Sequence, residues 1–173
     1  PSGQPASQGR ADLHTQLYEA LARLDTPDRE AALAKLAARL GRPPRLRSTH
    51  RPLDREQLYR LAAHPLVTIG AHTRSHPHLG RIAATRQAAE LAGSKADLEA
   101  WLGRPVELIA YPHGSTNAAT PRLAAEAGFR AGFTTMPRVV PHRLDPLRVP
   151  RINIEDQDGD QFAALLRWYR LSA

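Results

Sequence analysis

The sequence contains no cysteine and no long hydrophobic run, and each absence excludes a class of structure. Without cysteine there is no disulfide framework and no thiolate metal site, so a bound metal would be held by histidine and carboxylate groups. No apolar run approaches the ~20 residues that a helix needs to span a bilayer, so we expect no membrane span. The opening stretch, PSGQPASQGR, lacks an initiator methionine and the apolar core of a signal peptide. We expect it to be a point within a longer chain, which leaves bacterial cytoplasm or cell envelope open as the location.

Lysine is scarce as well, because only Lys35 and Lys95 occur and almost all positive charge comes from arginine. The formal net charge of +7 raises the question of nucleic-acid binding. The arginines are scattered, however, with only a modest cluster in residues 41–51, and no nucleic-acid-binding motif accompanies them. We therefore predict that nucleic acid is not a partner.

The chain has 173 residues, 42% of them hydrophobic, which is enough for one domain with a core. Three helices are predicted before residue 64. Leucines recur at helical spacing in residues 13–24, Thr26 is expected to cap a second helix, and Gly41 is expected to end it. Asp54 followed by Gln57 predicts a capping box for a short third helix. This part of the sequence shows no residues that indicate chemistry.

Strands and helices alternate from Leu66 onward, which favours parallel pairing with right-handed crossovers. Ligands in such folds bind at the carboxyl ends of the strands. The predicted strands are LVTIG (66–70), VELIAY (106–111), RAGFTT (130–135) and RINIE (151–155), and the predicted helices are 83–102, 120–128 and one that Asp158 caps.

A group of histidines follows the first predicted strand, in AHTRSHPHL (71–79). His72 and His76 are four residues apart, so in a helical turn or a tight loop both imidazoles can point at one cation. Neutral imidazole suits zinc and other first-row divalent ions, so the spacing does not name the metal. We expect His78 to point elsewhere and His64 to end a helix. Two surface histidines in a turn are the alternative, which their position after a strand disfavours.

The second predicted strand runs into YPHGS (111–115). A Tyr-Pro-x-Gly turn brings backbone amides close to whatever lies above the sheet, because Gly114 permits unusual dihedral angles. Such amides can stabilise an oxyanion. The alternative is a plain strand-to-helix turn.

Four stretches together resemble the polysaccharide deacetylases, the NodB-like carbohydrate esterases: VTIGAHTRSHPHL, LEAWLGRPVELIAYPHGS, LAAEAGFRAGFTT and DPLRVPRI. The resemblance covers roughly residues 53–155. It implies an α/β fold with a partial or distorted (β/α) barrel, here with extra N-terminal helices. Residues 1–52 would be a tail and helical insertion, and residues 53–173 the C-terminal part of the deacetylase domain. The implied reaction is hydrolysis of N- or O-acetyl groups on an acetylated carbohydrate, with a divalent metal that is commonly Zn²⁺.

The resemblance also implies roles for individual residues. His72 and His76 match the family's two metal-binding histidines. Tyr111, Pro112 and Gly114 match its substrate-groove turn, and the backbone amide of His113 matches its oxyanion donor.

The sequence departs from the family pattern at several points. No Asp-Asp pair occurs, although such a pair supplies the family's general base and a metal ligand. Ala110 and His113 stand where many members have Arg and Tyr, and the late Leu-x-His element is not evident. His142 is a substitute general acid supported only by its loop position.

We therefore expect a C-terminal portion of a deacetylase with incomplete activity. The alternative is a non-catalytic module that binds carbohydrate or a partner. Because an open barrel exposes strand edges, self-association or a missing N-terminal segment is expected to cover them.

Overall fold

The computed structural model describes residues 5–171 except 23, 25, 42–48 and 50. The chain divides into two compact units, Pro1–Pro52 and Leu53–Ala173. None of the described helices is both long enough and apolar enough to cross a membrane.

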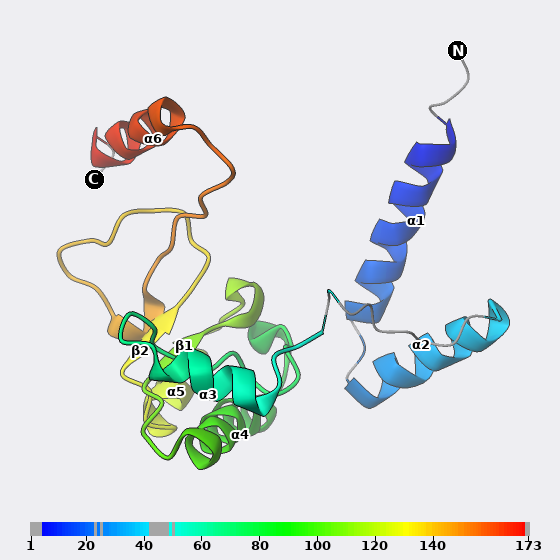
Figure 1. The fold of residues 1–173 in the computed structure, drawn as a ribbon, viewed down its shortest axis with the longest axis horizontal. Coiled ribbons are helices and arrows are strands. Elements are labelled where there is room, and N and C mark those ends of the chain that lie inside the picture. The colour runs from blue at the N-terminus through cyan, green and yellow to red at the C-terminus, as the bar shows by residue number, and fades with distance from the viewer. Residues whose placement is uncertain (1–4, 23, 25, 42–48, 50, 172–173) are drawn as a thin grey trace. The chain divides into compact units, whose positions relative to one another are not determined.

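The first unit contains two helices, α1 (Pro5–Ala22) and α2 (Thr26–Arg39) (Figure 1). Both helices were predicted, but α1 begins earlier than the leucine pattern of residues 13–24 and ends before Leu24, and α2 begins at Thr26 itself rather than after it. Gly41 follows the end of α2 with a φ of +60°, a left-handed conformation that glycine adopts at little cost. The arginine cluster of residues 41–51 lies largely outside the described residues.

A short parallel sheet forms the centre of the second unit. Strand β1 (Leu108–Ala110) pairs with β2 (Ala131–Phe133), with Ile109 opposite Gly132. Single parallel bridges extend the sheet on both sides, from Ala71 to β1 and from Val149 to β2. The predicted parallel pairing is therefore confirmed, while the two regular strands do not establish a barrel.

Two predicted strands are wrong. Residues 66–70 form no strand, and pairing begins only at Ala71, because Leu66 remains 87% exposed and packs into no core. Residues 151–155 form no strand either, and the bridge lies just before them at Val149. The apolar Ile154 is exposed, so this segment has no buried face to hold it against the sheet.

Helices α3 (Arg55–Ala63), α4 (Ala84–Leu102), α5 (Thr120–Glu126) and α6 (Gly159–Leu171) complete the second unit, with the 3₁₀ turns η2 (Leu79–Arg81), η3 (Pro112–Gly114) and η4 (Pro146–Arg148). The capping box of Asp54 and Gln57 is confirmed, with reciprocal bonds of 2.9 and 3.0 Å. Gly103 ends α4 in a left-handed conformation, which agrees with the predicted end of this helix at residue 102. The buried core consists of Ala71, Leu79, Leu91, Val106, Ile109, Tyr111, Leu123, Ala124, Phe129 and Leu147.

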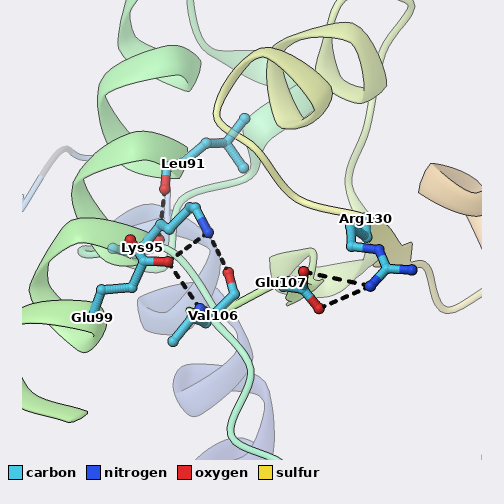
Figure 2. Close-up of polar contacts among 7 residues, drawn as sticks. Leu91, Lys95, Glu99, Val106, Glu107 and Arg130 are labelled. Atoms are coloured by element: carbon cyan, nitrogen blue, oxygen red, sulfur yellow. Dashed lines mark hydrogen bonds and ion pairs between the residues drawn. The ribbon is translucent and has the colours of Figure 1, made fainter. Parts of the chain in front are cut away.

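A polar clamp joins the end of α4 to the start of β1 (Figure 2). Lys95 Nζ donates to Glu99 Oε1 and to the carbonyl of Val106, both at 2.7 Å. The same Glu99 oxygen accepts the N–H of Val106 at 2.9 Å. Figure 2 also shows the ion pair of Glu107 with Arg130, 3.2 Å long, which joins the segments entering the two strands. These contacts tie α4 and both strand entries together at one end of the sheet.

The loop between β2 and η4 is closed at its base. Thr134 N–H donates to the carbonyl of Val149 at 2.8 Å, and Arg151 N–H donates to that of Met136 at 3.1 Å. Arg151 Nε also donates to the carbonyl of Thr134 at 2.8 Å. The loop between these contacts is therefore held in place at both of its ends.

A buried polar pair connects α4 to α5. Thr120 Oγ1 donates to Gln87 Oε1 at 2.7 Å, and Gln87 Nε2 donates to the carbonyl of Ile82 at 3.0 Å. Both side chains are fully buried. Every buried side-chain nitrogen and oxygen in the described residues has a partner, so this pair is a satisfied network inside the core.

Replacing Thr120 with Val should destabilise the protein by about 1–3 kcal/mol, because Gln87 Oε1 loses its donor in the core while the side-chain shape is kept. Urea unfolding followed by circular dichroism measures the change. Thr85→Val, on the exposed first turn of α4, is the matched control and should change stability by less than about 0.5 kcal/mol. Equal midpoints for the two variants would contradict the role of the buried pair.

Candidate functional site: a histidine cluster at the strand ends

Four imidazole rings lie together where the parallel strands end. The ring centroids of His72 and His76 are 4.7 Å apart, and those of His76 and His113 are 4.6 Å apart. His78 stacks on His113 at 3.9 Å with an angle of 13° between the planes. The loop after Ala71 and the turn after β1 thus meet at one edge of the sheet, as expected for the carboxyl ends of parallel strands.

The expectation that His78 points away from the other histidines is wrong. Gly80 N–H donates to Ser115 Oγ at 3.2 Å, and Asn117 Nδ2 donates to the carbonyl of Gly80 at 3.3 Å. These bonds fasten the segment after His78 to the segment after His113, so the two rings meet. His64 ends α3 as predicted, and its Nδ1 accepts the N–H of Leu66 at 3.2 Å.

His72 has a fixed tautomer. Its Nδ1 lies 2.6 Å from the carbonyl oxygen of Ala110. Because a carbonyl oxygen can only accept, the ring must donate from Nδ1, which leaves the lone pair of Nε2 free. Metal-binding histidines typically use this arrangement, since the backbone bond orients the ring and raises its basicity.

Three residues other than glycine have positive φ in the described part of the chain, and all three lie in this site: Thr73 (64°), His76 (55°) and His113 (56°). Each such conformation costs on the order of 1–3 kcal/mol and persists only where the surroundings enforce it. One enforcing bond is internal to the loop, where Thr73 Oγ1 accepts the N–H of His76 at 3.1 Å. Concentrated strain of this kind indicates a functional site.

The turn after β1 contains a backbone donor at His113, the residue whose ring contacts those of His76 and His78. Gly114 N–H donates to the carbonyl of Tyr111 at 2.9 Å, which closes the turn. Among the described residues, no hydrogen bond engages the N–H of His113. Gly114 has a φ of +62°, and a Cβ there would overlap Thr135, so only glycine fits this turn.

Tyr111 does not line a groove, contrary to the role carried over from the family. Its side chain is 0% exposed, and its hydroxyl donates to the carbonyl of Leu147 at 2.9 Å. Burial, together with the nearby Asp145 carboxylate, raises the pKa of Tyr111 to about 12. Pro112 is buried as well. Both residues therefore support the turn from inside the core, and the turn's accessible groups belong to His113 and Gly114.

Two of the four rings, those of His78 and His113, have electrostatic surroundings that favour neutral imidazole. Partial burial lowers the pKa of His78, and the charge of nearby Arg81 lowers it further. The pKa of His113 is lowered in the same way, mainly by removal from water and then by His78. Neutral imidazole is the form that binds metal ions.

The donor set fits part of a metal site. His72 and His76 supply two imidazoles, but in the described residues no three potential ligands are arranged so that they could hold one ion. No ring contact joins His142 to the cluster in that same part of the chain. Two residues that sequence reasoning missed, Glu90 and Asp97 on α4, contact the histidine loop instead. Glu90 and Asp97 lie 15 to 23 residues along the chain from the loop residues that they contact, so the sequence gave no signal of these contacts.

Tyr111→Phe should lower the free energy of unfolding by about 1–2 kcal/mol at neutral pH, because the Leu147 carbonyl loses its donor. As the pH rises above 10, the free energy of unfolding of the variant should also fall less than that of the wild type. An unfolded tyrosine ionises near its ordinary pKa of 10.0, whereas Tyr111 keeps its proton to about 12. The wild-type contribution is therefore complete below pH 10 and is lost as the pH rises toward 12.

Urea titrations between pH 7 and pH 11 measure both effects of Tyr111→Phe. Tyr59→Phe, at a 44% exposed position on α3, is the control. If Tyr59→Phe reproduces both changes, the Tyr111 hydroxyl is not their source.

Comparison with known proteins identifies the fold and the family. The structure resembles the Streptococcus pyogenes deacetylase PplD in complex with acetate, with a TM-score of 0.62 and 25% identity over 70% of this chain and 53% of that one. It also resembles a polysaccharide deacetylase from Bacillus cereus, with a TM-score of 0.59 and 24% identity over 68% of this chain and 37% of that one. A third similar structure is IcaB from Ammonifex degensii, with a TM-score of 0.53 and 23% identity over 72% of this chain and 56% of that one.

The chain spans about half the length of PplD, the first of these structures. No curated protein sequence matches it. The family model described as polysaccharide deacetylase matches residues 8–132, which is most of the chain and includes both the histidine loop and the turn after β1. The resemblance seen in the sequence is thereby confirmed, and the chain belongs to the polysaccharide deacetylase family.

Proposed function

We propose that this chain carries the metal-binding and oxyanion-binding part of an enzyme that removes acetyl groups from an acetylated polysaccharide or amino sugar. One observation supports the proposal above all. In a member of this family, the rings of His72 and His76 lie 4.7 Å apart at the carboxyl ends of parallel strands, and the ring of His113, whose N–H no described residue engages, contacts that of His76.

His72 and His76 would hold a divalent ion, for which we propose Zn²⁺. A bound ion of this kind polarises an acetyl carbonyl and lowers the pKa of a bound water to about 7. The chain's own residues prepare this chemistry. The bond of His72 to Ala110 keeps Nε2 available as a ligand, and the N–H of His113 would donate to the oxyanion that forms on the acetyl carbonyl.

The general base and a carboxylate ligand are not supplied by an Asp-Asp pair in this sequence, because none occurs. We therefore propose that residues 53–173 form the C-terminal part of the deacetylase domain and that residues 1–52 form a helical insertion. In this view the carboxylates come from a segment outside these 173 residues. We propose His142, a loop histidine, as the substitute for the general acid.

The absence of the Asp-Asp pair favours a second function, a non-catalytic module that binds acetylated carbohydrate or a partner chain. Ala71 is the only described residue that pairs with the outer side of β1. This side of the sheet would receive another strand, either from a second copy or from a further segment of the protein. Under this alternative the histidine cluster would bind its ligand without hydrolysing it.

His72→Ala and His76→Ala should each weaken Zn²⁺ binding by more than about 100-fold, because each removes a ligand rather than one of its supports. Competition with a chromophoric chelator measures the dissociation constant. His14→Ala, on the exposed surface of α1, should bind Zn²⁺ as the wild type does. Equal affinity in all three variants would show that the metal site lies elsewhere.

The purified chain should release little or no acetate, because it lacks the general base. Acetate is measured after incubation with Zn²⁺ and either N-acetylglucosamine oligomers or an O-acetylated xylan. Carbohydrate binding without acetate release would support the non-catalytic alternative. Rapid metal-dependent release that His72→Ala abolishes would show that the chain already contains its base.

A further inference from the structure

One carboxylate on α4 binds the backbone of the histidine loop, residues 72–76. Glu90 Oε2 accepts the N–H groups of Arg74 and Ser75, both at 2.9 Å. Its other oxygen accepts the hydroxyl of Ser75. The half-buried Glu90 side chain therefore satisfies three donors from two consecutive residues of the loop.

The position of these bonds within the loop matters. Arg74 and Ser75 lie between His72 and His76, and the strained residues Thr73 and His76 flank them. Two neighbouring N–H groups held by one oxygen fix the orientation of two successive peptide planes. The loop is thus held at His72 by the carbonyl of Ala110 and in its middle by Glu90. Hydrogen bonds to a charged acceptor are the stronger kind, which suits a loop that must retain an unfavourable backbone.

A second contact between the loop and α4 is weaker. Arg74 Nε and Nη2 donate to the two oxygens of Asp97 at 2.6 and 2.7 Å. The side chains are 53% and 42% exposed, and exposed ion pairs contribute little because water screens them. A Cβ at Gly93 would come within 2.6 Å of Arg74 Cζ, but this is the flexible end of the arginine, which can move aside.

We propose that Glu90 is the positioning residue of the metal-binding loop, and that Asp97 is not. Glu90 fixes the backbone between the two histidines so that their rings meet in one place. The proposal rests on the proposed function only in taking His72 and His76 as metal ligands. It assigns Glu90 no contact with metal or substrate.

Glu90→Gln tests the proposal, because the amide keeps the size of the side chain but has only one accepting oxygen. The dissociation constant for Zn²⁺ should rise about 10- to 100-fold, as is typical when a group that orients a ligand is lost. Glu99→Gln is the matched control. It makes the same substitution on the same helix, and Glu99 also accepts a backbone N–H, that of Val106, away from the loop. Glu99→Gln and Asp97→Asn should leave the dissociation constant unchanged.

Amide hydrogen exchange in the metal-free protein provides a second measurement. In Glu90→Gln the amides of Arg74 and Ser75 should exchange faster, while Ala71, bonded to the carbonyl of Leu108 at 2.8 Å, should stay protected. If the wild type binds no Zn²⁺, the proposal of a metal site is wrong. The exchange rates of the Arg74 and Ser75 amides still test whether Glu90 holds the loop.

Two results would overturn the inference. The first is unchanged exchange of Arg74 and Ser75 in Glu90→Gln. The second is a loss of Zn²⁺ affinity in Glu99→Gln equal to that in Glu90→Gln, which would reflect general destabilisation. If Glu90→Gln does not fold, Ser75→Ala replaces it, since it removes the hydroxyl bond to Glu90. Faster exchange of the Ser75 amide is then expected, and unchanged exchange contradicts the proposal.

Discussion

Ala110 carries the interaction on which the site depends. Its N–H pairs with the carbonyl of Ala71 at 3.0 Å, as in a parallel ladder. Continuing that ladder would bring the N–H of Thr73 to the carbonyl of Ala110. The imidazole of His72 takes that carbonyl instead, and Thr73 turns into a left-handed conformation. The ladder therefore ends where the histidine loop begins, and one backbone oxygen both stops a strand and orients a proposed ligand.

The histidine cluster contains several features that are unfavourable in free energy, and the rest of the fold has to offset them. Three residues hold left-handed backbones, and burial depresses the pKa of two of the rings. The stabilising contacts come from helix α4 and from the core. Glu90 holds one loop from α4, and Tyr111 anchors the other from the core. The histidine loops are thus hydrogen-bonded to a half-buried carboxylate and to a turn anchored in the core, which is how a protein keeps a strained site in one conformation.

Features that depend on local sequence were predictable. The capping box, the end of α4 and the presence of the helices depend on local sequence, and His72 and His76 were visible as a spaced pair after an apolar run. Features that depend on distant packing were not. The sequence could not show that Tyr111 is buried, that His78 returns to His113, or that Glu90 binds the loop, since each needs two segments brought together by the fold.

The loop after β2 has a consequence for how members of such a family could diverge. Its base is fixed by Thr134, Val149 and Arg151, so its length is independent of the strands. Lengthening a loop whose ends are fixed costs little, about 0.6 kcal/mol for each doubling. The loop leaves the sheet at the same edge as the histidines. Insertions and deletions there would reshape the approach to the site while leaving its proposed ligands untouched, which makes this segment a natural place for substrate preference to evolve.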